Sequence, residues 1–131
     1  MSDYKPDYIE YRLSKADEAL HDAKLLAENN SWNACINRLY YACYYAVSAL
    51  LLKNGISTQT HTGLKTQFNL HFIKTGLIKK ESGKLYADLM DWRQKGDYGD
   101  MFDFSKETVD PLIKPVEQFL KTITQLIKNS Y

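Results

Sequence analysis

Residues 37–51, NRLYYACYYAVSALL, decide the fold, because the most apolar segment of the chain also carries four tyrosines and an arginine. At 3.6 residues per turn, this segment and the residues just before it form one helix with three stripes. The stripes are Ile36, Leu39, Cys43, Ala46 and Leu50; Asn33, Asn37, Tyr40 and Tyr44; and Ala34, Arg38, Tyr41 and Tyr45. The first stripe is an ordinary core face. A helix that is apolar on almost every side is expected to be covered on more than one side.

The polar tips of this helix need partners once they leave water, because a buried polar group without a hydrogen bond costs about 1–3 kcal/mol. Other side chains, a second subunit or a ligand are the candidates. We expect a second copy of the chain to cover part of the helix, with Tyr41 and Tyr45 at the dimer interface. The alternative is that the tyrosines bridge core and solvent. Arginine is seldom buried unless it is paired, so Arg38 favours a partner.

An amphipathic helix is expected before this segment. Apolar residues three or four apart predict that it runs from near Tyr8 to about Asn29. Asp7 and Glu10 have the form of a capping box, and Pro6 discourages helix upstream. We therefore place the start of this helix after Pro6.

The helix of the quoted segment is expected to start after Ser31, which can cap it, and to run to residue 54. Gly55 suits the left-handed conformation that ends helices. Thr58 or Thr60 can cap a third helix, for which Gly76 is the expected end.

Two more helices are expected in the second half of the chain. The core face of the fourth carries Leu85, Leu89 and Trp92. Residues 95–105, KGDYGDMFDFS, are rich in turn-forming residues and separate it from the last helix. The last helix carries Val109, Leu112, Val116, Leu120, Ile123 and Ile127. Asp110 and Pro111 suit a helix start, but Pro115 then removes a backbone hydrogen bond, so we expect an irregular or kinked first turn.

These patterns predict an all-α protein, a bundle of about five helices in a single domain over residues 1–131. No segment alternates apolar and polar residues as a strand would, and no repeat is visible. The formal net charge of +1 gives no general field that would attract nucleic acid, so any anion site must be local.

The sequence also bears on compartment and redox state. No apolar run is long enough to span a membrane, and the start, MSDYKPDYIEYR, does not look like a secretion signal, so we expect a cytoplasmic protein. Cys35 and Cys43 lie eight positions apart on one helix, about 12 Å along its axis. Bridged cysteines have Cα atoms within about 7 Å. Both are therefore expected to be free, buried thiols.

Three segments, taken in order, resemble the uncharacterised bacterial branch of the HEPN domains (higher eukaryotes and prokaryotes nucleotide-binding). They are NRLYYACYYAVSALLLKNG, THTGLKTQFNLHFIKTGLI and LMDWRQKGDYGD, and the resemblance covers most of the chain. It implies an up-and-down bundle of about five helices that pairs with itself, with the functional groove where two subunits meet.

The resemblance also marks a candidate site. HEPN domains that cleave RNA share an arginine followed after four to six residues by a histidine, and Arg93 matches the arginine. The histidine is absent: Tyr98 stands after four intervening residues and Asp100 after six. Histidine suits the removal of a proton from a 2′-hydroxyl because it titrates near neutral pH, whereas tyrosine has a reference pKa of about 10. Asp97 could accept the proton instead, so Arg93, Asp97 and Tyr98 are the candidate catalytic group.

The sequence also allows a second interpretation of Arg93. On a helix, Tyr86, Met90, Arg93 and Asp97 share a stripe that is distinct from the predicted core face, so Arg93 is expected to face a groove or a partner. It could bind phosphate through its planar guanidinium, with Arg38 adding a second charge if the two helices are neighbours. Alternatively, it could only form a salt bridge with Asp97.

Arg38, Tyr41 and His61 are the candidate RNA- or nucleotide-binding residues. His61 opens the third helix within the segment THTG, where free backbone amides favour an anion. The alternative is that His61 only bonds a neighbouring loop. The histidines and cysteines have no spacing typical of zinc sites, and no phosphate-binding loop is present, so we expect no metal and no cofactor.

Three functions remain open from the sequence. The first, which we favour, is a homodimeric HEPN component of a toxin–antitoxin or defence-like system that binds RNA or nucleotide at the dimer groove, with a minimal nucleotidyltransferase as a candidate protein partner. The second is a metal-independent endoribonuclease with an altered motif. The third is a non-catalytic scaffold dimer.

Overall fold

The computed structural model describes residues 5–99 and 102–129, without the side chains of Lys5 and Tyr98. The elements are α1 (Lys5–Glu28), α2 (Trp32–Lys53), α3 (His61–Phe68), the π-helix η2 (Asn69–Ile73), α4 (Lys80–Tyr98), α5 (Lys106–Val109), the 3₁₀-helix η3 (Asp110–Leu112) and α6 (Ile113–Asn129). No strand occurs within the described ranges. The predicted all-α fold is confirmed, with five helices of eight or more residues.

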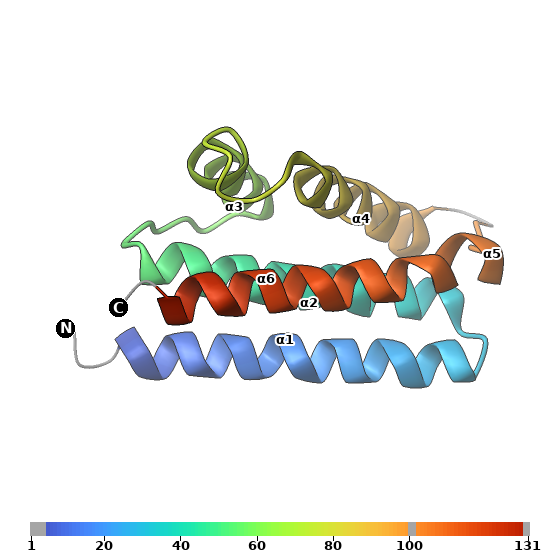
Figure 1. Cartoon of the computed structure of the whole chain (residues 1–131). Helices are drawn as coiled ribbons and strands as arrows, with labels where there is room; N and C mark the ends of the chain where they lie inside the picture. Colours follow the sequence, from blue (N-terminus) through green and yellow to red (C-terminus); the bar gives the residue numbers. More distant parts are fainter. Residues whose placement is uncertain (1–4, 100–101, 130–131) are drawn as a thin grey trace.

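Helix α2 is the central element of the molecule. It packs against α1 and α6, and the pair α3 and α4 lies over the same helix on another side (Figure 1). Half of its residues are buried, and among these are all five of the predicted core stripe. Its apolar surface is therefore covered by helices of the same chain, and a second copy is not needed to cover the core stripe.

The tyrosines of α2 divide into two groups. Tyr40 is fully buried, and its ring stacks on that of Tyr86 from α4 at 5.9 Å. Tyr41, Tyr44 and Tyr45 are half-buried and pack against the core from its edge. The polar tips of this helix therefore lie partly inside the bundle and partly at one side of it.

Helix α1 begins earlier than predicted. It starts at Lys5, so that Pro6 lies in the first turn, where a residue without an N–H group is tolerated. The predicted start after Pro6 is wrong for this reason. After α1, Asn30 adopts a positive φ of 59°, which lets the chain turn into α2. Ser31 precedes α2 as predicted but makes no capping hydrogen bond with its side chain.

The third predicted helix consists of two pieces. Thr60 caps α3, and its hydroxyl accepts a hydrogen bond from the Gly63 amide at 2.8 Å. The chain then widens into the π-helix, where the Lys74 amide donates to the Asn69 carbonyl at 2.8 Å. The positive φ at Gly76 ends the segment at the predicted place, but the change of helix type was not predicted.

Helix α4 differs from its prediction in its buried face and in its length. Its buried residues are Ser82, Gly83, Tyr86, Leu89, Met90 and Arg93, whereas Leu85 and Trp92 are half-exposed. The stripe that was assigned to a groove or partner therefore faces α2 of the same chain. The helix also continues to Tyr98, so residues 95–98 of the predicted turn are helical.

The irregular start of the last helix is confirmed. One short turn, α5, is followed by the 3₁₀ turn η3 with Pro111, and only then does α6 begin. The connection from α4 is fixed to α2 by Asn33, which donates to the Phe102 carbonyl at 2.9 Å and accepts from the Phe104 amide at 2.8 Å. Asp100 lies outside the described residues.

Cys35 and Cys43 are free and buried, as predicted. Within the part of the chain that the structure describes, no helix combines the length and the apolar character that a membrane crossing requires.

Candidate anion-binding site

Arg93 is the charged residue around which the candidate site is built. It lies on α4 and is 8% exposed, and its guanidinium carbon stands 4.9 Å from the ring centre of Tyr40 and 5.7 Å from that of Tyr41. Such contacts with aromatic faces stabilise a cation that has left water. Nevertheless its Nε has no hydrogen-bond partner among the described residues.

Asp97 lies one turn after Arg93 but is not tightly paired with it. The closest approach is 3.8 Å, between Asp97 Oδ2 and Arg93 Nη1, which is longer than a hydrogen bond. The same oxygen accepts a hydrogen bond from Asn37 Nδ2 at 2.9 Å. Asn37 therefore binds Asp97 more closely than Arg93 does, and the positive charge of Arg93 is only partly compensated.

Arg38 is joined to the same group of residues. Its Nε and Nη2 donate to Asn37 Oδ1 at 3.0 and 2.9 Å. Its guanidinium carbon lies 5.0 Å from the ring centre of Tyr41, which also contacts Arg93. The packing of α2 against α4 thus brings the two arginines to one aromatic ring.

His61 approaches the site from the start of α3. Its Nδ1 is hydrogen-bonded to the Tyr40 hydroxyl at 2.5 Å, and its ring stacks on Tyr44 with centres 4.6 Å apart. Partial burial lowers the pKa of His61 from its ordinary value of 6.5, and the positive charge of Arg93 lowers it further. His61 is therefore a neutral imidazole at neutral pH.

Most residues singled out from the sequence meet in one cluster, the Arg93 cluster, which consists of Arg38, Tyr41, His61, Arg93 and Asp97 together with Asn37 and Tyr40. Tyr45 stands at its edge, with its ring 6.1 Å from that of Tyr41. The side chain of Tyr98 lies outside the described part of the structure. Asn37 and Tyr40 were not predicted as site residues, although they share a helix stripe whose polar tips called for partners.

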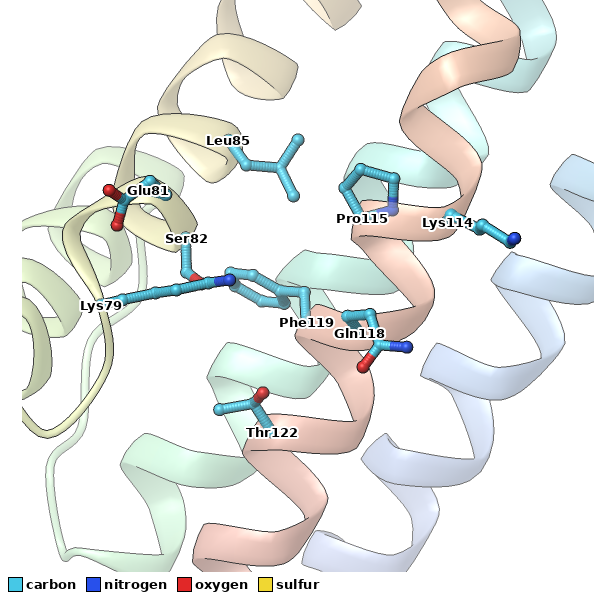
Figure 2. Close-up of a pocket in the computed structure, with 9 residues that line it drawn as sticks. All are labelled: Lys79, Glu81, Ser82, Leu85, Lys114, Pro115, Gln118, Phe119 and Thr122. Carbon is cyan, nitrogen blue, oxygen red and sulfur yellow. The ribbon is translucent and has the colours of Figure 1, made fainter.

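A separate hollow lies between the start of α4 and α6 (Figure 2). It has a volume of about 440 Å³, and its walls include Leu85, Pro115 and Phe119. Lys114 lines it as well, but its amino group points away from α4 in Figure 2. This hollow shares no residue with the Arg93 cluster. In the described ranges no three potential metal ligands lie close enough to hold an ion.

Comparison with known proteins assigns the family. The HEPN domain family matches residues 9–126. The "UPF0332 protein" of Thermotoga maritima is 44% identical over 125 residues, which are 95% of each chain. The match shows that this protein belongs to the HEPN family, as the resemblance implied.

Two archaeal relatives have names that refer to a function. Both come from Methanocaldococcus jannaschii and are named "Putative toxin", and each is 29% identical to this chain. The matches cover 92% of this chain and 89% of the first relative, and 93% of this chain and 84% of the second.

Proposed function

We propose that this HEPN protein acts as a homodimer that binds RNA or nucleotide through its phosphates, at a groove formed by the Arg93 clusters of two subunits. In this proposal Arg93 is the principal phosphate ligand. Arg38 supplies a second charge, and Tyr41 supplies an aromatic surface for a base. The protein belongs to a toxin–antitoxin or defence-like system in which a minimal nucleotidyltransferase is the candidate partner.

The observation that carries the proposal is the incomplete pairing of Arg93. A buried charge is costly unless it is paired and hydrogen-bonded. Arg93 has one distant carboxylate, at 3.8 Å, and a buried Nε without a partner among the described residues. A phosphate oxygen is the acceptor that a guanidinium fits best, often with two parallel hydrogen bonds.

The half-buried stripe of α2 supports the dimer. Arg38, Tyr41 and Tyr45 follow one another along the helix and remain accessible beside α3 and α4. Aromatic residues and arginine are enriched in protein interfaces. A second subunit on this stripe would lie next to Arg93, so that one groove would contain the cluster twice.

The names of the two archaeal relatives support the biological setting. A toxin that acts on RNA must bind phosphates. The formal net charge of the chain is only +1, so the positive charge that such binding needs has to be local, and the Arg93 cluster provides it. Co-purification of the tagged protein from its native host tests this setting. Recovery of a nucleotidyltransferase with the protein is the expected result, and recovery of the HEPN chain alone contradicts the partner.

Titration with a fluorescent single-stranded RNA at moderate salt tests the binding site. Arg93→Ala is expected to abolish saturable binding, because it removes the principal phosphate ligand. Arg12→Ala is the matched control: it removes the same charge from α1, where Arg12 donates to the Ser48 carbonyl at 3.4 Å. An equal loss of RNA binding in both variants would mean that only the net charge of the protein matters. Circular dichroism verifies that each variant is folded.

The endoribonuclease alternative predicts a different result for Asp97. If Asp97 is the base that removes the proton, Asp97→Asn abolishes metal-independent cleavage of RNA. If the site only binds, Asp97→Asn strengthens binding, because it removes a negative charge close to Arg93.

A further inference from the structure

The hydrogen bond between His61 and Tyr40 determines what His61 can do in the Arg93 cluster. The Tyr40 hydroxyl has His61 Nδ1 as its hydrogen-bond partner at 2.5 Å. Tyr40 is fully buried, and this burial raises the pKa of its phenol well above the ordinary value. The phenol therefore keeps its proton at neutral pH.

The proton of the Tyr40 hydroxyl needs an acceptor inside the bundle. His61 Nδ1 lies 2.5 Å from the hydroxyl oxygen, within hydrogen-bond distance. We therefore assign Tyr40 as the donor and Nδ1 as the acceptor of this bond. A neutral imidazole that accepts at Nδ1 carries its own proton on Nε2.

The outer nitrogen of His61 remains available for a ligand. No described residue forms a hydrogen bond with Nε2, and the ring is held by stacking against Tyr44 at 4.6 Å and Tyr40 at 5.7 Å. The rings of Tyr40 and Tyr41 contact both Arg93 and His61. His61, on α3, and Arg93, on α4, therefore lie near the same two aromatic rings of α2.

We propose that His61 donates its Nε2–H to the same phosphate that Arg93 binds, and that Tyr40 holds the imidazole in the tautomer that this role requires. The inference rests on the proposed function and names a role for a histidine that lies outside the arginine–histidine motif. His61 is then a binding residue and Tyr40 a positioning residue.

This role excludes His61 as the general base of RNA cleavage in the resting site. A base must accept a proton through a free lone pair, and the lone pair of this tautomer, on Nδ1, is occupied by the Tyr40 hydroxyl. The charged and titratable side chains around the imidazole are Arg93 from α4 and Tyr40, Tyr41 and Tyr44 from α2. Arg93 opposes protonation of His61, so the neutral donor form is retained.

Three variants of the full chain test the proposal with the same fluorescent RNA. His61→Ala is expected to weaken binding about tenfold, which is the size of one hydrogen bond to a charged group. His61→Gln places an amide N–H group where Nε2–H stands but cannot act as a base near neutral pH, and it is expected to retain binding within about threefold. Tyr40→Phe is expected to weaken binding less than His61→Ala. It leaves the imidazole in place and only allows His61 to adopt either tautomer.

Nitrogen NMR of the protein labelled with ¹⁵N-histidine provides a second readout. In the wild type, the proton of His61 is expected on Nε2, and in Tyr40→Phe a mixture of both tautomers is expected. A proton on Nδ1 in the wild type would overturn the proposal even if no RNA bound.

The outcomes separate this inference from the proposed function. If Arg93→Ala binds as well as the wild type, the proposed function fails. If Arg93→Ala loses binding but His61→Ala retains it, the proposed function stands and the role of His61 is rejected. If His61→Gln binds as weakly as His61→Ala, donation from Nε2 is rejected.

Discussion

Asn37 links the two arginines of the site to one carboxylate. Its amide oxygen accepts from Arg38, and its amide nitrogen donates to Asp97, which lies 3.8 Å from Arg93. Both ends of one short side chain are used, and each bond has a charged partner. Asn37 thus lies closer to the carboxylate than Arg93 does, and under the proposed function this leaves the guanidinium for a phosphate.

Replacement of Asn37 is therefore expected to have two effects. Asn37→Ala should lower the free energy of unfolding by about 1 kcal/mol or more, because it removes hydrogen bonds to two charged groups. It should also weaken RNA binding, because the released Asp97 can pair with Arg93. Urea unfolding and the RNA titration measure the two effects.

Asn29→Ala is the control for this change. Asn29 is an exposed asparagine in the turn just after α1, and it donates to the Leu25 carbonyl at 3.0 Å, apart from the cluster. Unchanged RNA affinity in Asn37→Ala would show that Asn37 does not govern the pairing of Arg93.

The charged residues of the candidate site are easier to predict from the sequence than the neutral ones. Arg93 was found through a motif, and Arg38 was found because a charge in an apolar helix is unusual. Asn37 and Tyr40 act through contacts with α4 and α3, and these contacts depend on how the helices pack. A single sequence does not contain that information, so the roles of both residues required the structure.

At the scale of the element, α3 is the short helix that carries His61 to the site. With eight residues it has little stability of its own, since isolated helices below about 12–15 residues are marginal in water. The bond from the Gly63 amide to the Thr60 hydroxyl therefore matters for the position of His61.

Loss of this cap is expected to destabilise α3. Thr60→Ala should lower the free energy of unfolding by about 1 kcal/mol, whereas Thr60→Ser retains the hydroxyl and should have a smaller effect. Thr62→Ala, an exposed position two residues later, is the control. Urea unfolding measures the difference, and equal stability of Thr60→Ala and Thr62→Ala would contradict the importance of the cap.

The sequence predicts a helix boundary correctly where a single residue determines it. Thr60, Gly55 and Gly76 ended or capped helices as predicted, since their backbone or side-chain chemistry acts locally. The π-helix and the buried face of α4 were missed. Both depend on how a helix packs against its neighbours. The apolar residues of α4 lie on two adjacent faces, and the sequence does not show which of these faces is buried.

At the scale of the whole molecule, burial of titratable groups makes the fold sensitive to alkaline pH. Burial raises the pKa of the Cys35 thiol from 9.0 to about 11, and the charge of Asp110 contributes. Burial also raises the pKa values of Cys43, Tyr40 and Tyr86. The folded state thus keeps these protons at a pH where the unfolded chain releases them.

Stability is therefore expected to fall as the pH rises above 9.0, the ordinary pKa of the thiol. Below that pH, both states hold the protons and these groups cause no change. Urea unfolding from neutral pH to about pH 11 measures the loss, and Cys35→Ala should reduce its slope. A constant free energy of unfolding across this range would contradict the prediction.

The proposed dimer makes a prediction about mass in solution. Tyr45→Asp places a charge on the half-buried stripe of α2 and should convert the dimer to a monomer, because a desolvated charge without a partner is costly. Tyr11→Asp on α1 is the control, since Tyr11 is 61% exposed. Analytical ultracentrifugation measures both, and an unchanged mass for Tyr45→Asp would exclude this face as the interface.

The central position of α2 has a consequence for synthesis on the ribosome. Helices α1 and α2 emerge well before α6, which covers another side of α2. At about 5–20 residues per second, this side stays open for several seconds while the remaining chain is translated. A nascent chain that stalls before residue 113 would present that apolar surface to chaperones or to other chains.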